Sequence, residues 1–299
     1  MRVVGFSFIK NAVILDYPIV EAIESILPLC QEFVIMVGDS TDSTSKLIEE
    51  LAKKSDKIRI YNSIWDDSLR EGGQVLAVET NKALAQLVEN DKENNQKTDW
   101  AFYIQGDEVI HEKYLSTIKK EMETYKDNPK VDGLLLNYLH FYGSYDYVGD
   151  SRKWYRREIR IIKAREDIFA YRDAQGFRKK PNQKLNVKHI DASVYHYGWV
   201  RPPQKQLAKQ KQFNKLWKSE EWVDEKFGSL ETFDYSGIDS LKKFEGTHPK
   251  VVEERIKNMN WNFEYDISKK NYTPRIRFLT WVEKQTGWRV GEYKNYKRI

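Results

Sequence analysis

The chain has 299 residues, of which 40% are hydrophobic and 13% aromatic, and its formal net charge is +5. This composition excludes an intrinsically disordered chain, and the length is sufficient to bury a large core. Cys30 is the only cysteine, which excludes a disulfide framework and a cysteine-based metal cluster.

The first 125 residues alternate between strand-like and helical patterns. Val3–Ile9 predicts a buried strand, apolar residues at helical spacing follow up to Pro28, and residues 33–37 predict a second strand. Such a β-α-β unit implies a parallel sheet with right-handed crossovers. The same alternation then predicts, in order, a helix around 44–51, a strand at 58–61, a helix ending near 87, a strand at 100–104 and a helix over 115–125.

The pattern changes beyond Pro129, where strand-like segments follow one another with little helix between them. These segments are 131–138, 159–163, Ile168–Tyr171 and 192–197. We therefore expect a mixed or antiparallel extension of the sheet, followed by a basic helix over 204–218 and a helical, then aromatic and basic, tail from Glu253 onward. The basic helix would pack on the core or lie on a membrane surface.

The predicted fold is thus a single α/β domain, with one half over residues 1–130 and a second half over 131–299. No apolar run is long enough to cross a bilayer, and the chain begins directly with a strand-like run. We expect a cytoplasmic protein, with any membrane contact peripheral and at the cytoplasmic face.

The strand-like run before residue 105 ends in Gln105, Gly106, Asp107 and Glu108. A buried strand would deliver the two acids to its carboxyl end, which is where α/β sheets bind ligands. Adjacent carboxylates are costly to bury unless a cation shares the site, and oxygen ligands suit Mg²⁺ or Mn²⁺. The stretch predicts either a metal site or, alternatively, a cap on the following helix by Asp107.

Three motifs follow one another in the first half: residues 39–44 after the second strand, residues 70–81 at the start of a helix, and residues 105–108. This series resembles family 2 glycosyltransferases of the GT-A fold, with their D-x-S-T-D-x-T-like turn, R-N-x-G-x-x-x-A-x-N-like helix and D-x-D-like metal motif. The resemblance covers roughly residues 1–125. Two positions depart from it: Gln105 replaces the first acid of the D-x-D pattern, and the turn at Gly38 is one residue shorter.

The resemblance implies a metal-dependent glycosyltransferase that binds a nucleotide-sugar donor across the tips of the first strands. Its acceptor would be a glycan, a lipid-linked molecule or another hydroxyl compound. Asp39 would contact the base or ribose, Arg70 and Asn81 would lie near the diphosphate, and Asp107 with Glu108 would hold Mn²⁺ or Mg²⁺. The other donor-site positions that it implies are Ser7, Lys10, Asn11, Gln105 and Gly106.

The second half supplies three further candidates. His196, in the sequence Tyr-His-Tyr-Gly-Trp, is either a metal ligand or a histidine bonded within an aromatic cluster. An inverting transferase needs a carboxylate near the acceptor hydroxyl as general base, and the candidates are Asp173 and Glu158. Asp173 follows a strand-like run and precedes a glycine turn, although either acid could simply pair with a neighbouring arginine.

Two other functions remain as alternatives. A nucleotidyltransferase would keep the nucleotide-binding half, but residues 6–11 lack a glycine-rich, lysine-bearing turn that would hold a triphosphate. The basic segment 152–218 favours an anionic partner, which allows a nucleic-acid-binding protein. Because no recognised nucleic-acid-binding motif interrupts these lysines, we expect no nucleic-acid partner.

Overall fold

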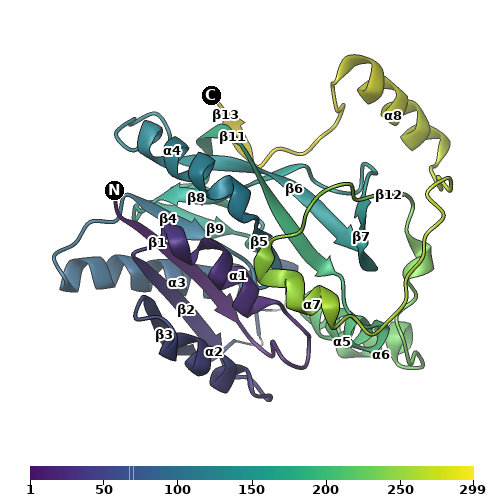
Figure 1. The fold of residues 1–299 in the computed structure, drawn as a ribbon, viewed down its shortest axis with the longest axis horizontal. Helices are drawn as coiled ribbons and strands as arrows, with labels where there is room; N and C mark the ends of the chain where they lie inside the picture. The colour runs from purple at the N-terminus through teal and green to yellow at the C-terminus, as the bar shows by residue number, and fades with distance from the viewer. Residues whose placement is uncertain (67, 70) are drawn as a thin grey trace.

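The first four strands form a parallel sheet at one side of the molecule. β1 (Val3–Ile9) lies between β2 (Glu32–Gly38) and β4 (Trp100–Tyr103), and β3 (Ile58–Ser63) pairs with β2 at the edge. The computed structural model describes every residue of 1–299 except Asp67 and Arg70. Figure 1 shows these strands side by side, with helices in front of and behind them.

Helices cover both faces of this sheet because the side chains of each strand alternate between its two faces. On β2, Phe33 and Ile35 belong to one buried cluster and Val34 to the other. The first cluster includes α1, α2 and α4, and the second includes α3. The bounds of these helices are α1 Ile19–Ile26, α2 Thr44–Lys53, α3 Gln74–Glu93 and α4 Leu115–Tyr125.

The sheet continues with antiparallel and mixed pairings, in the order β3-β2-β1-β4-β8-β6-β11-β10-β9. β8 is antiparallel to both β4 and β6, and β11 is parallel to β6. The strands of this second part are β5 Glu108–Ile110, β6 Gly133–Tyr142, β7 Ser144–Gly149, β8 Arg157–Lys163, β9 Ile168–Tyr171, β10 Gly176–Lys179, β11 Gln183–Trp199, β12 Leu241–Lys243 and β13 Tyr296–Arg298.

The long strand β11 connects the two parts of the sheet. Besides β6, it pairs with β5, β10 and β13. Its pairing with β5 sets His196 opposite Glu108, and the amide of Tyr197 donates a hydrogen bond of 2.8 Å to the carbonyl of Asp107. The residues after β4 and the end of β11 are therefore held side by side.

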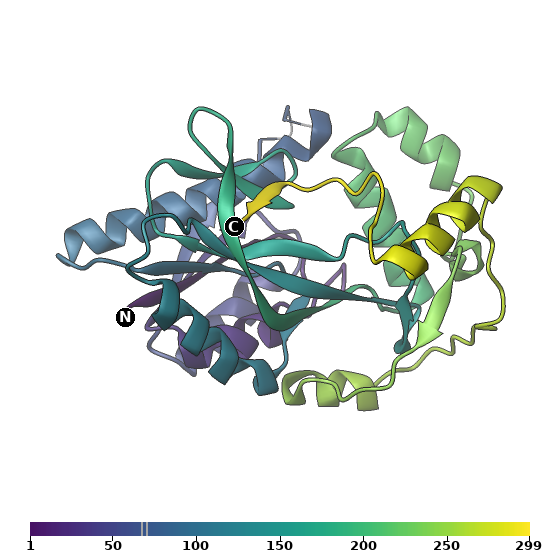
Figure 2. The same ribbon diagram turned by 90° about the horizontal axis from the view of Figure 1, so that it is seen from above.

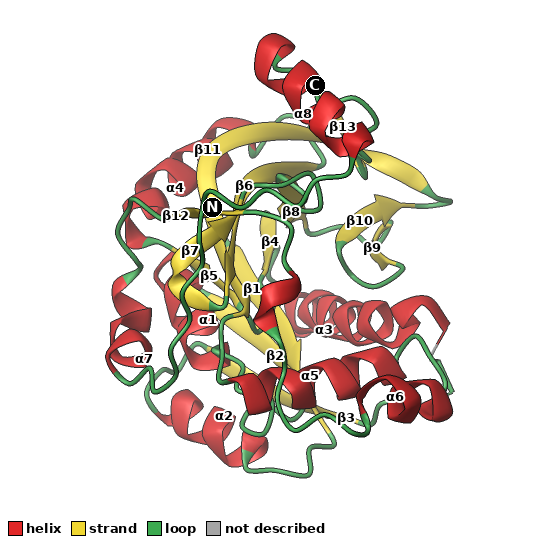
Figure 3. Cartoon of the chain, turned by 90° about the vertical axis from the view of Figure 1, so that its right-hand side faces the viewer, coloured by secondary structure: helices red, strands yellow, loops and turns green. Residues whose placement is uncertain are grey.

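The C-terminal segments lie beside the sheet and around its far end, as Figure 2 shows. Their helices are α5 Pro203–Lys215, α6 Glu220–Phe227, α7 Glu253–Lys257 and α8 Pro274–Thr286. Figure 3 shows α5 crossing the lower edge of the parallel strands, close to α6 and on the same side as α3. No helix in the described part of the chain has the length and apolar character needed to cross a membrane.

A fully buried ion pair links β5 to the centre of the sheet. Two nitrogens of Arg160 on β8 each donate a 2.7 Å hydrogen bond to the carboxylate of Glu108, and both residues have 0% exposure. The hydroxyl of Tyr138 donates a third bond of 2.7 Å to the same carboxylate. Removing one member would leave a buried charge without its partner, which is far more costly than losing a surface pair.

This arrangement confirms the predicted fold class, an α/β fold with a mostly parallel first part and a mixed extension. Val3–Ile9 and Ile168–Tyr171 are strands with the predicted bounds. The alternative in which Asp107 caps a helix is wrong, because β5 follows it and α4 begins only at Leu115. The strands β5, β7, β10, β12 and β13 were not predicted, and most of them are short segments whose pairing depends on distant residues.

The ion pair makes a prediction about stability. Arg160→Met should lower the free energy of unfolding by about 3–5 kcal/mol, because it leaves the Glu108 carboxylate buried and unpaired. The double variant Glu108→Gln/Arg160→Met should recover part of that loss. Urea unfolding of the two variants and the wild type measures both effects.

Glu166→Gln is the matched control, because it removes the exposed pair between Lys92 and Glu166. Its unfolding midpoint should equal that of the wild type within error. Equal midpoints for Arg160→Met and Glu166→Gln would contradict the role that we assign to the buried pair.

Candidate functional site

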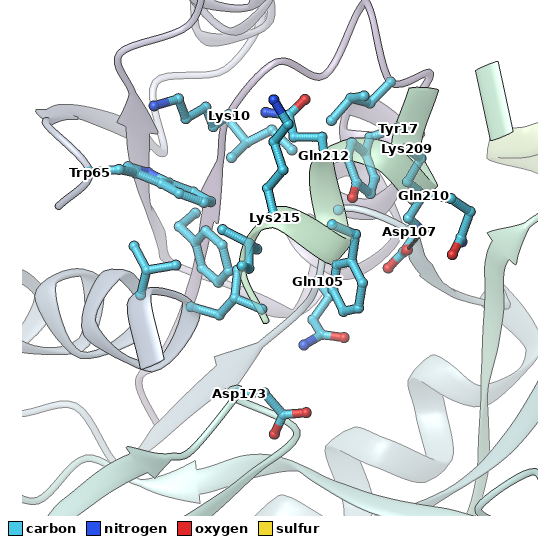
Figure 4. A pocket seen from close by; sticks show the side chains of 18 of the residues that line it. Lys10, Tyr17, Trp65, Gln105, Asp107, Asp173, Lys209, Gln210, Gln212 and Lys215 are labelled. Carbon is cyan, nitrogen blue, oxygen red and sulfur yellow. Dashed lines mark hydrogen bonds and ion pairs between the residues drawn. The ribbon is translucent and has the colours of Figure 1, made fainter. Parts of the chain in front are cut away.

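A cavity of about 590 Å³ opens at the carboxyl ends of β1 and β4, beneath α5. Figure 4 shows Trp65 and Lys10 at one end of the cavity and Lys209 and Asp107 at the other. Asp173 lies on the wall opposite α5. Helix α5 and the residue after it contribute much of the cover, with Lys209, Gln210, Gln212, Phe213, Lys215 and Leu216. The site therefore combines the strand tips of the first half with a helix of the second half.

Asp107 faces this cavity and pairs with Lys209. The Lys209 ammonium donates a 2.9 Å hydrogen bond to Asp107 Oδ2 and a 2.8 Å bond to the carbonyl of Gly198. Although burial alone raises the pKa of Asp107, the charges of Lys209 and Arg201 hold it well below its usual range. Burial lowers the pKa of Lys209 to about 8, and Arg201 acts in the same direction.

Gly198 is required for this close arrangement. A Cβ atom there would lie 2.5 Å from His196 Nε2 and 2.9 Å from Asp107 Oδ2. His196 Nε2 lies 3.7 Å from Asp107 Oδ1, which is beyond hydrogen-bond distance. The other ring nitrogen of His196 is 3.1 Å from His140 Nδ1.

The two histidines lie in an aromatic cluster, where His140 is buried and His196 is partly buried. His140 stacks on Trp154 with a centroid distance of 5.0 Å, and its Nε2 bonds to the carbonyl of Tyr155 at 2.8 Å. Burial lowers the pKa of His140 to about 3, with a further contribution from His196, and burial also lowers the pKa of His196. Both rings are therefore neutral at physiological pH.

An aromatic platform lies at the other end of the cavity. Trp65 packs near Phe8 with a centroid distance of 5.8 Å, and the Lys10 ammonium lies 5.4 Å from the centre of the indole. Lys10 also pairs with Asp39 at 2.7 Å, and the Trp65 amide donates to the same carboxylate at 3.2 Å. The Trp65 indole nitrogen is buried and has no hydrogen-bond partner among the described residues.

Asp173 stands on a strained turn between β9 and β10. The residues on either side, Arg172 and Ala174, have φ values of 57° and 59°, in the left-handed region that non-glycine residues rarely adopt. Asp173 lines this cavity and also a second, neighbouring one of about 830 Å³. Strain of this kind persists only where the surrounding structure enforces it, and it gathers at functional sites.

The structure brings some of the predicted site residues into the cavity and leaves others outside it. Those that line it are Lys10, Gln105, Gly106, Asp107, Asp173 and His196. Asp39 reaches it through Lys10 and Trp65, and Arg70 lies outside the described residues. The predicted residues that do not line it are Ser7, Asn11, Asn81, Glu108 and Glu158.

Each residue outside the cavity has another partner or location. The Ser7 hydroxyl bonds to the carbonyl of Ile104 at 2.6 Å, and the Asn11 side chain accepts from the Thr41 amide at 2.8 Å. Asn81 exchanges two hydrogen bonds with the backbone of Ala170 and lines the second cavity. Glu108 pairs with Arg160, and Glu158 is buried on β8 with 3% exposure.

A divalent cation does not fit the residues that the resemblance implied for it. Within the described part of the chain, no group of three or more His, Cys, Asp or Glu side chains lies close enough to hold a metal ion. Glu108 is engaged by Arg160, and Gln105 carries no charge. Asp107 is the remaining acid of the motif, and its carboxylate already pairs with the Lys209 ammonium.

Three residues that line the cavity were not predicted from the sequence: Lys209, Trp65 and Tyr17. Lys209 lies three residues after Gln206 and four before Phe213, so these side chains share one face of α5. A lysine on the face of a helix that also carries apolar residues was the available signal. It gave no indication of which partner, 102 residues away, that lysine would meet.

No protein-family model matches the sequence, and no curated protein matches it. Among solved structures, TarS from S. aureus matches with 13% identity and a TM-score of 0.41, over 75% of this chain and 42% of that chain. Residues 1–349 of TarS in complex with UDP match with 14% identity and a TM-score of 0.40, over 75% and 69% of the two chains.

Glucosyl-3-phosphoglycerate synthase from Mycobacterium tuberculosis, in complex with Mn²⁺, UDP and glucosyl-3-phosphoglycerate, also matches. Its identity is 17% and its TM-score is 0.28, over 48% of this chain and 45% of that chain. The chain thus spans less than half the length of the full TarS and synthase chains that it matches.

Glu158 leads to a prediction about pH. Burial, together with the nearby carboxylates of Glu108 and Asp173, raises its pKa from 4.5 to about 8, although Arg160 opposes this change. Between these two values the unfolded chain has released the proton and the folded protein still holds it. This group therefore makes the folded state less stable as the pH rises from 4.5 to 8, by at most about 1.4 kcal/mol per pH unit.

Glu158→Gln removes this titration. The free energy of unfolding of the variant, minus that of the wild type, should be larger by a few kcal/mol near pH 8.5 than near pH 5. Urea unfolding at the two pH values gives both differences. The same difference at both would show that Glu158 titrates normally in the folded protein.

Proposed function

We propose that the protein is a glycosyltransferase that moves a sugar from a nucleotide-sugar donor to a hydroxyl acceptor. One observation carries the proposal. A single cavity at the carboxyl ends of parallel strands combines an aromatic platform, fixed cations and a carboxylate on the opposite wall. These are the groups needed to bind a base, hold a diphosphate and accept a proton.

The end of the cavity at Trp65 fits the nucleoside. An indole face offers a stacking surface that is worth about 1–3 kcal/mol per base in nucleotide-binding proteins. Asp39 lies at the tip of the neighbouring strand, in position for a ribose hydroxyl. Asp39 is bonded to both Lys10 and Trp65, which line the cavity. Its position therefore supports the predicted contact of Asp39 with the base or ribose.

The end at Lys209 fits the diphosphate. When the bond between the anomeric carbon and the diphosphate oxygen breaks, its electron pair stays on that oxygen, so negative charge develops on the leaving group. A positive charge fixed in a buried site stabilises that change more than a solvated charge would. Asp107 orients the Lys209 ammonium by a 2.9 Å hydrogen bond.

The wall at Asp173 fits the acceptor. As the acceptor oxygen forms its bond to the anomeric carbon, its proton must pass to a base, and a carboxylate at this wall would take it. The left-handed residues on both sides of Asp173 hold the turn that presents it. Glu158 is the weaker candidate, because it is buried outside the cavity and keeps its proton up to a pH of about 8.

Nucleotide binding tests the proposal most directly. Thermal unfolding with UDP, GDP, CDP or dTDP should show a rise in melting temperature for at least one of them, because a ligand that binds only the folded state stabilises it. Trp65→Ala should weaken that binding about tenfold, in proportion to the loss of stacking. Trp281→Ala, a change of an exposed tryptophan on α8, is the matched control and should leave the shift unchanged.

The reaction separates the proposal from a nucleotidyltransferase. A glycosyltransferase releases a nucleoside phosphate from the matching nucleotide sugar, slowly to water and faster with an acceptor. A nucleotidyltransferase would instead release pyrophosphate from a nucleoside triphosphate and a sugar phosphate. Absence of any nucleotide shift, together with absence of both reactions, would falsify the proposed function.

Helix α8 supports the predicted peripheral contact with a membrane and, with it, a lipid-linked acceptor. Phe278 and Trp281 stack on each other with exposures of 62% and 58%, and none of the helix residues is buried. Residues 269–299 contain nine Lys or Arg against two Glu, a net charge of +7. Exposed aromatic side chains beside basic ones are typical of segments that lie on anionic lipid surfaces.

Vesicle sedimentation tests this contact. The protein should sediment with vesicles that contain phosphatidylglycerol and remain in solution with pure phosphatidylcholine, and added salt should release it. Phe278→Ser/Trp281→Ser should reduce the bound fraction severalfold, whereas Trp222→Ser on α6 should not. Equal binding of both variants would rule out α8 as the contact surface.

A further inference from the structure

We propose that the ammonium group of Lys209, in place of a divalent cation, supplies the fixed positive charge that binds the donor diphosphate and stabilises it as it leaves. The inference rests on the proposed function and names the group that serves one step of it. It departs from the metal dependence that the sequence resemblance implies.

The Lys209 ammonium is held in place rather than free to move. Lys209 has 9% exposure, and its ammonium donates to Asp107 Oδ2 at 2.9 Å and to the Gly198 carbonyl at 2.8 Å. It also lies 5.0 Å from the centre of the Tyr17 ring. An ammonium group has three donors, so one remains for a ligand in the cavity that Lys209 lines.

Buried positive charge exceeds buried negative charge at this end of the cavity. Arg201 has 0% exposure and lies 5.2 Å from the Tyr17 ring, so Tyr17 is flanked by two cations. Arg201 Nη1 donates to the Gly198 carbonyl at 2.8 Å, and its Nε and Nη2 have no partner among the described residues. Asp107 balances one of the two cations.

Such an excess of positive charge favours a phosphate over a metal ion. A divalent cation at Asp107 would have to displace the Lys209 ammonium and would still lie near the buried Arg201 guanidinium. A diphosphate would instead meet a charge that is already oriented, with no reorganisation at the moment of reaction. The positive excess therefore matches the charge of the leaving group.

The acids on either side of Asp107 do not restore a metal site. Gln105 is neutral, where the resemblance would place the first acid of the motif. Glu108 accepts hydrogen bonds from Arg160 and Tyr138 and is fully buried. One carboxylate could hold a divalent cation together with substrate phosphates only if its own charge were free. Here that charge pairs with Lys209.

Calorimetric titration of the full chain with UDP, GDP, CDP and dTDP, in EDTA and in Mn²⁺, tests the inference. The nucleotide that binds should do so in EDTA with a Kd within about threefold of the value in Mn²⁺. Lys209→Met should raise that Kd about tenfold or more in EDTA, because a charge-assisted contact is lost. Lys211→Met, two positions along α5 and not among the residues lining the cavity, is the control and should bind like the wild type.

Lys209→Met leaves Asp107 buried without its partner and could impair folding. The double variant Lys209→Met/Asp107→Asn removes both charges and should fold, which thermal unfolding would show, while still binding the nucleotide about tenfold more weakly. Binding that requires Mn²⁺, or metal-free binding that neither variant weakens, would overturn the role of Lys209 and leave the proposed function intact. If none of the four nucleotides binds in either condition, both proposals fail.

Discussion

The buried ion pair of Glu108 and Arg160 fixes the part of the fold on which the cavity depends. Glu108 also accepts a 3.2 Å hydrogen bond from the Gln105 amide, and its own amide donates to the Gln105 carbonyl at 3.1 Å. The turn between β4 and β5 is thereby closed on itself and attached to β8. Asp107, in the middle of that turn, has no freedom to rotate into the core and faces the cavity instead. The two adjacent acids thus have different roles: Glu108 stabilises the sheet, and Asp107 lines the cavity.

The second constraint is the position of α5 over the strand tips. Lys209 comes from a helix that follows β11 in the chain, and it reaches Asp107 through the space that Gly198 leaves. The site is therefore complete only when both halves of the chain are folded together. This explains why the paired charges of the site, Asp107 and Lys209, lie about a hundred positions apart in the sequence.

The sequence was sufficient to predict the parallel part of the sheet, because its strands and helices have strong local periodicity. It also placed Asp107 at a strand tip, which the structure confirms. It could not show that Glu108 would meet Arg160, 52 residues later, since that contact depends on the order of β8 and β6 in the sheet. The basic helix was predicted, but its position over the cavity depends on packing that periodicity does not encode.

The same reasoning explains why the predicted metal site and the structure differ. A motif resemblance identifies residue types at a strand tip, whereas the ligand of a carboxylate is decided by the total charge around it. At Asp107 that total includes Lys209 and Arg201, neither of which belongs to the motif. Once an ammonium and a guanidinium are buried beside a single carboxylate, that end of the cavity has an excess of positive charge, which suits an anion. Gln105 stands where the resemblance would place the first acid of the motif. Its neutral side chain is consistent with an anion site, because an additional carboxylate would cancel the excess of positive charge that a diphosphate requires.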